Sequence, residues 1–457
     1  MYRQILYDYK VVRRVGIKDL LHKHRGATGS WRKVLPIQTP RRITIPDFEF
    51  CTIADLLNRL RSMDLPYSEG GHTVYLPPPA LEKTPFKAIK DAYPPGVGLK
   101  IARNPGDADS SEYLHGREHG TFERSLTHGH PHLTLVANLL HVKGLGPRLY
   151  DLLELRCGDQ VWTAYVIEHV NGREPTLSEC EAGIKGIRDL ENQGLIKLLN
   201  PGGYDHQDLQ PPLCGGNAWM DERGNFRYVD FQAFLLSDYG SYLERIAIDA
   251  SKETHFGDVS LLRGGRHLYQ SIPAIDLPYR RNIDARFAVI DRLMERAGVS
   301  VRDRLVLDIG CNIGMMMGQY LKAGAKWCHG WDLPRVTEHC ERLLFALGCT
   351  RFSTTGCEIT RSRPLLEDLP DFLRPSLESC AISYLAIRGH VGWLDALAAI
   401  PWSLLIYEGH ENEGEEDFQG HLDQLRTLAN VRLKGTDTYV DGDSDPRRVA
   451  VLLRNNG

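Results

Sequence analysis

A short stretch around residue 308 constrains the fold of this chain more than any other segment. Residues 304–309 read Arg-Leu-Val-Leu-Asp-Ile, which has the length and apolar character of a buried strand, and residues 310–314 read Gly-Cys-Asn-Ile-Gly. A buried strand that passes through a glycine turn into a helix is a unit of a doubly wound α/β sheet. Glycine allows the backbone to approach a ligand where a Cβ atom would clash. The sequence therefore predicts such a sheet, with a ligand at this turn.

The neighbouring sequence supports this prediction. Residues 282–297 carry apolar side chains at helical spacing, and apolar runs at 327–332, 380–387 and 402–410 are typical of buried parallel strands. At 457 residues the chain is long enough for more than one domain. We therefore predict an α/β domain with a Rossmann-like doubly wound sheet over residues 276–457.

The glycine turn carries a recognisable motif. Asp308 stands two residues before Gly310, and Asn312 and Gly314 follow. The pattern resembles motif I of class I S-adenosylmethionine (SAM)-dependent methyltransferases, an acid followed by Gly-x-Gly-x-Gly. Asn312 takes the place of the middle glycine, which asparagine tolerates because it enters left-handed backbone conformations more easily than most residues. The resemblance covers about residues 275–457 and implies that SAM is the cofactor.

A predicted cofactor site follows from the motif and from the strand ends. Asp332 ends the next strand and is placed to accept hydrogen bonds from a ribose diol. The resemblance implies that Asp308 and Gly310 hold the methionine side of SAM and that Glu358 meets the adenine edge. The other two predicted cofactor-binding residues are Asn312 and Gly314.

Predicted catalytic residues lie after the fourth and fifth strands of the sheet. Methyl transfer from a sulfonium is an in-line displacement that needs alignment and, for an unactivated hydroxyl, a general base. Ligands of such sheets bind beyond the carboxyl ends of the strands, where His390, Glu408 and His410 are expected. An anionic acceptor would instead need only positioning by cations, for which Arg388 is a candidate.

A second pattern lies in the first half of the chain. Residues 217–232 read as a hairpin that starts with Asn217 and ends in Asp230-Phe-Gln, and Asp208 lies on a loop upstream. Together these residues resemble the catalytic loop and metal-binding segment of the protein-kinase-like fold. The resemblance implies that Asp208 accepts the proton of a substrate hydroxyl, while Asn217 and Asp230 hold Mg²⁺ against the phosphates of ATP.

Three further segments follow the order of that fold. Gly70 and Gly71 resemble a glycine turn, Lys100 resembles the lysine that binds the ATP phosphates, and Glu168 lies in a segment resembling the hinge between two lobes. The resemblance implies ATP binding by these residues in an α+β two-lobed domain over residues 46–275.

The two halves together are similar in content, although reversed in order, to the bifunctional kinase/methyltransferases of O-antigen chain termination. This resemblance implies that the protein phosphorylates a hydroxyl of a glycan or similar small molecule and methylates the same substrate. A pseudokinase that acts as a binding or scaffolding module remains an alternative. Nine positions separate Asp208 from Asn217 where the kinase pattern has five, and Gln232 replaces the expected glycine. The glutamate partner of Lys100 is not evident, with Glu118 and Glu123 as the two candidates. A dinucleotide-dependent oxidoreductase is disfavoured, because the turn lacks the spacing Gly-x-Gly-x-x-Gly.

The charge is unevenly distributed. Residues 1–45 hold eleven basic and two acidic side chains, a charge of +9, whereas the whole chain has −4 and the remainder therefore −13. We predict that this basic extension contacts a lipid-linked or polyanionic substrate or a membrane surface peripherally. No nucleic-acid partner is expected, because the chain as a whole is not basic. The ten cysteines have no metal-site spacing, and we expect reduced thiols in a cytoplasmic protein.

Overall fold

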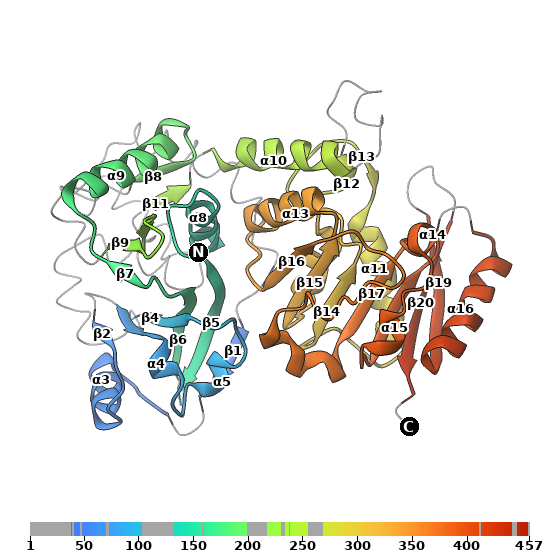
Figure 1. Ribbon diagram of the computed structural model, residues 1–457, viewed down its shortest axis with the longest axis horizontal. Helices are drawn as coiled ribbons and strands as arrows, with labels where there is room; N and C mark the ends of the chain where they lie inside the picture. Colours follow the sequence, from blue (N-terminus) through green and yellow to red (C-terminus); the bar gives the residue numbers. More distant parts are fainter. Residues whose placement is uncertain are drawn as a thin grey trace, which may run out of the picture.

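The structure is a computed structural model, and Figure 1 shows two halves lying side by side. The residues that it describes are 38, 41–45, 48–69, 73–102, 131–157, 160–198, 217–229, 234–236, 238–254, 268–410, 413–440 and 446–455.

The C-terminal half is built on a seven-stranded sheet in the order β16-β15-β14-β17-β18-β20-β19. The first five strands in this order are parallel, and β20 runs antiparallel to both of its neighbours. The strands are β14 Leu305–Ile309, β15 Trp327–Asp332, β16 Phe352–Gly356, β17 Ala381–Leu385, β18 Leu404–Glu408, β19 Val431–Tyr439 and β20 Arg447–Arg454. This topology confirms the predicted Rossmann-like sheet, because the chain order reverses at β14.

Helices cover both faces of this sheet. One apolar core contains Val306 and buried apolar residues of α11, α12 and α13, whereas the other contains Leu305, Leu307 and residues of η4, α15 and α16. These helices are α11 Ile283–Arg296, α12 Met315–Lys322, α13 Pro334–Ala346, the 3₁₀ helix η4 Asp371–Ser379, α15 Ala396–Ala399 and α16 Glu415–Ala429. Successive side chains of a strand point to opposite faces, so β14 contributes to both cores.

The N-terminal half begins with a six-stranded sheet in the order β1-β5-β6-β4-β3-β2. Its strands are β1 Arg41–Thr44, β2 Ser68–Glu69, β3 Thr73–Leu76, β4 Val97–Ala102, β5 Leu149–Cys157 and β6 Gln160–Glu168. The short segments that connect them include α3 Ile53–Ser62, α4 Pro78–Leu81 and α5 Lys87–Lys90. Strand β1 pairs in parallel with β5, so the end of the predicted basic extension belongs to this sheet. Residues 1–37 of that extension lie outside the described residues.

A second, more helical part follows. Its helices are α8 Pro131–Val142, α9 Leu177–Asn192 and α10 Tyr239–Thr254, and its strands are β7 Gly172–Arg173, β8 Ile196–Leu198, β9 Ala218–Asp221, β10 Phe226–Tyr228 and β11 Phe234–Leu236. The pairing of β9 with β10 confirms the hairpin predicted after Asn217. A sheet followed by a helical part is a mixed α/β arrangement, and these elements do not by themselves define a kinase.

The two halves meet at the end of α13. The Asn138 side chain, on α8, donates to the carbonyl oxygens of Phe345 and Cys349 at 2.9 and 3.1 Å. The Tyr239 hydroxyl, on α10, donates to the Ala346 carbonyl at 3.0 Å. The last carbonyl groups of a helix lack partners within the helix. The N-terminal half therefore supplies hydrogen bonds that α13 needs at its C-terminus (Figure 1).

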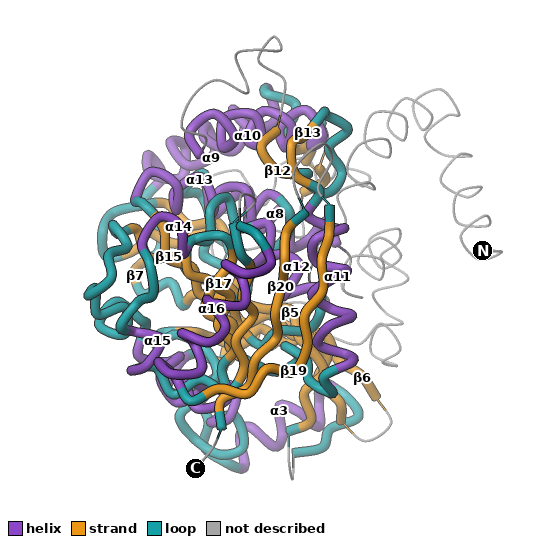
Figure 2. Tube along the Cα trace, turned by 90° about the vertical axis from the view of Figure 1, so that its right-hand side faces the viewer, coloured by secondary structure: helices purple, strands orange, loops and turns teal. Residues whose placement is uncertain are grey.

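A buried polar cluster makes a second contact between the halves. Arg351, just before β16, places Nη1 3.0 Å from Oδ1 of Asp151 on β5, and both side chains are almost wholly buried. The Tyr93 hydroxyl donates to the other oxygen of Asp151 at 2.5 Å. Gln38 accepts a hydrogen bond from the Thr350 backbone N–H at 3.0 Å. Figure 2, turned by 90°, shows the two sheets lying one behind the other.

The described cysteines and helices bear on two further predictions. Nine cysteines are free thiols, and eight of these nine are buried. The tenth, Cys214, lies outside the described residues. Within the described ranges, no helix is both long and apolar enough to cross a membrane.

Candidate functional site

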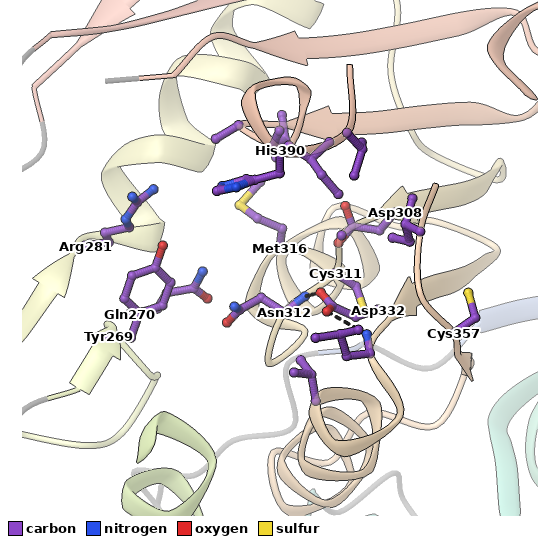
Figure 3. Close-up of a pocket in the computed structure, with 18 of the residues that line it drawn as sticks. Tyr269, Gln270, Arg281, Asp308, Cys311, Asn312, Met316, Asp332, Cys357 and His390 are labelled. Atoms are coloured by element: carbon purple, nitrogen blue, oxygen red, sulfur yellow. Dashed lines mark hydrogen bonds between the residues drawn. The ribbon is translucent and has the colours of Figure 1, made fainter. Parts of the chain in front are cut away.

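A cavity of about 460 Å³ opens at the carboxyl ends of the parallel strands (Figure 3). Its volume is in the range of small-molecule sites. Seven residues predicted from the sequence line it: Asp308, Gly310, Asn312, Asp332, Glu358, His390 and His410. The fold therefore brings together residues that are up to about one hundred positions apart in the chain.

The glycine turn forms one wall of the cavity. Gly310 has φ of +79°, and a Cβ atom there would overlap the side chain of Ile387. Asn312 has φ of +51°, which confirms the predicted left-handed conformation, and its Oδ1 accepts the backbone N–H of Ile313 at 2.8 Å. Position 310 therefore needs a glycine, and position 312 needs a residue such as asparagine that tolerates a left-handed conformation.

Gly314 does not line the described cavity, in contrast to its predicted role in cofactor binding. It precedes α12 with φ of +79°, and a Cβ atom there would lie 2.6 Å from Sγ of Cys340 and 2.8 Å from Cδ1 of Leu344. Both neighbours belong to α13. Gly314 therefore permits the close packing of α12 against α13.

Asp332 connects the second strand to the turn after the first. Its Oδ2 accepts the backbone N–H of Asn312 at 2.9 Å, and its Oδ1 accepts the backbone N–H of Leu333 at 2.8 Å (Figure 3). Burial raises the pKa of the Asp332 carboxyl, although these two N–H groups oppose the shift. Each carboxylate oxygen can accept a further hydrogen bond. Asp332 can therefore hold the turn and bind a ligand hydroxyl at the same time.

Asp308 lies near the end of β14 with 3% of its surface exposed. Burial raises the pKa of its carboxyl to about 6, while a hydrogen bond to Ser383 and the charge of Arg286 oppose the shift. The folded state therefore holds the Asp308 proton to a higher pH than an unfolded chain does.

We expect this shift to make the stability depend on pH. Between about pH 4 and pH 6 the folded state binds the Asp308 proton more strongly than the unfolded state does, so its contribution to the free energy of unfolding falls as the pH rises. Asp308→Asn, which has no proton to lose, should gain stability relative to the wild type across this window. Urea denaturation at pH 4, 5 and 7 measures the difference between the two proteins. A difference that stays constant with pH would contradict the assignment to Asp308.

Glu408 differs from its predicted catalytic role, because it is wholly buried and does not line the described cavity. Its carboxylate accepts two hydrogen bonds of 2.7 Å from Arg286, one of 3.0 Å from Arg447 and one of 3.1 Å from Tyr439. Burial would raise the pKa of Glu408, but the two arginines hold it below its ordinary value. A carboxylate held in this way is a poor base. Glu408 instead positions Arg286, which does line the cavity.

The two predicted histidines lie together at the cavity. His390 comes from the short helix α14 Arg388–Val391 and His410 follows β18, and their ring centroids are 5.9 Å apart. Arg388 is not among the lining residues. Its guanidinium lies 3.7 Å from Glu413 and 5.4 Å from the ring centroid of Trp393. The histidines are therefore better placed than Arg388 to contact a ligand.

The sequence did not predict the wall opposite the turn. Tyr269, Gln270 and Arg281 line the cavity from the parallel pair β12 Leu268–Gln270 and β13 Tyr279–Arg281. The domain boundary predicted after residue 275 falls between these strands, and strands of three residues are too short to show an alternating pattern in the sequence. The only signal in the sequence is a basic pair, residues 280 and 281, just before a predicted helix.

Of the residues predicted to bind ATP, Mg²⁺ or the phosphoryl acceptor, Gly70, Gly71, Asp208 and Asp230 lie outside the described residues. Asn217 is described, and its carbonyl oxygen accepts the backbone N–H of Val229 at 2.8 Å. Within the described part of the chain, no cluster of three or more His, Cys, Asp or Glu side chains is suited to a metal ion.

Lys100 lies on β4 as predicted, but Tyr75 covers part of the same strand. A Cβ atom at Gly98, two residues before Lys100 and on the same face, would overlap the Tyr75 hydroxyl. That hydroxyl is hydrogen-bonded to Nδ1 of His169 at 2.6 Å. The neighbouring Glu168 carboxylate accepts a backbone N–H at 2.9 Å. Tyr75 thus packs against the backbone of the strand that carries Lys100.

Comparisons with known proteins identify no family. No family model matches the chain, and no curated protein matches it. The methyltransferase domain of bacterial CtHen1 is 13% identical, with a TM-score of 0.29, over 38% of this chain and 100% of that domain. TrmK of M. capricolum, solved with S-adenosyl-homocysteine, is 12% identical, with a TM-score of 0.26, over 36% of this chain and 68% of that one. At these scores the likenesses carry no information about function.

Proposed function

We propose that this protein is a SAM-dependent methyltransferase and that the cavity of the C-terminal half is its active site. One observation carries the proposal: Asp308, Gly310 and Asp332 meet in one cavity at the point where the strand order reverses. This switch point is where open α/β sheets bind nucleotide-like ligands. The acid-containing glycine turn favours SAM over a dinucleotide, because it lacks the glycine spacing of a pyrophosphate site.

The lining residues fit the chemical groups of SAM. Asp332 would accept hydrogen bonds from the ribose hydroxyls, and Glu358, which also lines the cavity, would meet the adenine edge. Gly310 and Asp308, which both line the cavity, would lie beside the methionine part. When bound, SAM supplies an electrophilic methyl group on a sulfonium. The protein must hold the acceptor in line with that group and exclude competing water.

His390 is the proposed general base, with His410 beside it. A neutral imidazole accepts a proton near neutral pH, so His390 would take the proton of an acceptor hydroxyl or amine during transfer. Figure 3 shows His390 above the cavity, across from the turn. His410, with its ring centroid 5.9 Å away, limits the space in which the acceptor group can sit. Glu408 takes no part as a base, because two arginines hold its carboxylate.

For the N-terminal half we propose the scaffolding alternative. Its support is that Tyr75 covers the strand of Lys100 and that Asn138 and Tyr239 complete the C-terminus of α13. Residues at the other end of α13 line the cavity. Two expectations stay predictions. One is that the protein phosphorylates a glycan hydroxyl with ATP and Mg²⁺, and the other is that the basic extension contacts a lipid-linked substrate. Methyl incorporation into a cell extract that requires Mg²⁺-ATP would favour the bifunctional kinase instead.

Binding of S-adenosylhomocysteine tests the proposed function. Asp332→Ala should weaken this binding by about 1.5–3 kcal/mol, or about 10- to 150-fold, because it removes a charged acceptor from the ribose hydroxyls. Isothermal titration calorimetry measures the affinity. Asp423→Ala, an exposed residue of α16, is the matched control. Wild-type protein that binds no S-adenosylhomocysteine, or a folded Asp332→Ala variant with unchanged affinity, would refute the proposal.

A further inference from the structure

A buried serine lies beside Asp308 on the neighbouring strand. Ser383, on β17, pairs with Asp308, on β14, in the parallel register of the two strands, so both side chains point to the same face of the sheet. Val306, two residues before Asp308, also points to that face and belongs to the apolar core beneath α11, α12 and α13. Ser383 is wholly buried, whereas Asp308 lines the cavity (Figure 3). Ser383 therefore lies directly behind a carboxylate that faces the cavity.

The Ser383 hydroxyl is the middle of a hydrogen-bond chain. The Tyr320 hydroxyl, on α12, donates to Oγ of Ser383 at 3.1 Å, and Tyr320 is wholly buried as well. Because Oγ accepts this bond, the Ser383 hydroxyl can donate its own proton, and the carboxyl of Asp308 accepts a hydrogen bond from it. Burial and the charge of Asp308 raise the pKa of Tyr320, so its hydroxyl keeps its proton and remains a donor. The chain runs from α12 through β17 to the cavity.

The environment of Asp308 makes this donor important. Burial raises the pKa of the Asp308 carboxyl to about 6, and the hydrogen bond from Ser383 opposes that shift. Without this bond, the carboxyl would hold its proton to a higher pH. A protonated carboxyl has no charge and offers a ligand fewer acceptor sites than a carboxylate does.

We propose that Ser383, with Tyr320 behind it, is a positioning residue that keeps Asp308 ionised and directs its carboxylate toward the cofactor. Neither Ser383 nor Tyr320 is among the lining residues of the cavity, so both act through Asp308. The inference rests on the proposed function, and it adds to that site two residues that no motif in the sequence indicated.

Other titratable groups face Asp308 from the surrounding elements or lie across the cavity. Besides Tyr320, they are Arg286 on α11, Cys311 in the turn, Cys328 and Asp332 on β15, and the histidines His390 and His410. The two thiols stay neutral, because a hydrogen bond to Cys340 and burial raise the pKa of Cys311, and burial raises that of Cys328. A change of binding with pH therefore needs a second substitution to assign it to Asp308.

The affinity for S-adenosylhomocysteine, measured by isothermal titration calorimetry between pH 5 and pH 8, tests the inference. In the wild type it should fall in acid as Asp308 takes up its proton near pH 6. Ser383→Ala should move the midpoint of this fall upward by about one pH unit and weaken binding about fivefold at pH 6, with little change at pH 8. Tyr320→Phe should move the midpoint in the same direction by less.

Ser403→Ala is the matched control. The hydroxyl of Ser403 accepts a hydrogen bond from Arg304 at 2.6 Å just before β18, at the end of the sheet away from the cavity. This variant should keep the wild-type affinity and the wild-type midpoint.

Asp308→Asn separates action through Asp308 from a general loosening of the site. In that background Ser383→Ala should leave the affinity and its pH dependence unchanged, because the group that it acts on no longer titrates. A serine with a merely structural role would weaken binding equally in both backgrounds.

Three results would overturn the inference while the proposed function stands. They are wild-type binding of S-adenosylhomocysteine that does not change between pH 5 and pH 8, folded Ser383→Ala and Tyr320→Phe variants with the wild-type midpoint, and an effect of Ser383→Ala that persists undiminished in Asp308→Asn. Wild-type protein that binds no S-adenosylhomocysteine at any pH would instead refute the proposed function and this inference with it.

Discussion

Glu408→Gln should lower the free energy of unfolding by about 3–5 kcal/mol, which is among the largest effects expected of any single change in this chain. The carboxylate of Glu408 is wholly buried between Arg286 and Arg447, which are 5% and 1% exposed. The neutral amide would leave two buried guanidinium groups without an anion. The glutamine would also replace one acceptor oxygen by an NH₂ group, which cannot accept the hydrogen bonds that the two arginines now donate there.

Urea denaturation at pH 7 measures this effect. Glu415→Gln is a matched control, because Glu415 pairs with Arg448 while its own side chain is 75% exposed, and its loss should cost at most about 1 kcal/mol. The pKa of Glu408 lies below its ordinary value in the folded state, so its contribution is present above about pH 4.5 and is lost as the pH falls further. The difference between Glu408→Gln and the wild type should therefore shrink in acid. A variant as stable as the wild type at pH 7 would show that the arginines find other partners.

The sequence predicts the cavity wall at the glycine turn well, because local chemistry determines the conformation there. Asp308, Asn312 and Asp332 lie at strand ends and turns, where the strand period and the left-handed conformation fix their position. The structure places all three at the cavity. Their roles toward SAM stay proposals, but their placement needs no knowledge of distant residues.

Glu408 and Gly314 show where sequence reasoning fails. The end of a strand can be located from its apolar run, but the partner of a charged residue there cannot. Arg286 precedes Glu408 by 122 positions, and only the tertiary fold turns a predicted base into a buried ion pair. Gly314 was predicted to bind the cofactor, but the closeness of α13 shows that it serves packing. Gln270 and Arg281 escaped notice because strands of three residues carry no usable period.

In the N-terminal half, the sequence predicts the positions of secondary-structure elements better than it predicts their function. The strand of Lys100 and the hairpin after Asn217 occur where predicted. The position of Tyr75 could not be predicted, because it depends on Gly98 in a paired strand and on His169 beyond a third strand. The presence of these elements therefore does not by itself establish a nucleotide site.

Arg351→Met should cost about 3–5 kcal/mol of stability, because it leaves the wholly buried Asp151 without its guanidinium. The pair joins a strand of the N-terminal sheet to the segment before β16, so its loss tests whether the halves unfold together. One cooperative transition, shifted to lower urea as a whole, is expected by tryptophan fluorescence and by circular dichroism.

Arg361→Met is the control for that experiment, because the Arg361–Asp395 pair lies within the C-terminal half and its side chains are 76% and 62% exposed. Its effect should be within about 1 kcal/mol. Two separate transitions, of which Arg351→Met shifts neither, would show that the halves are energetically independent. A single shifted transition would instead show that the two halves unfold as one unit, which the hydrogen bonds of Asn138 and Tyr239 to the end of α13 also favour.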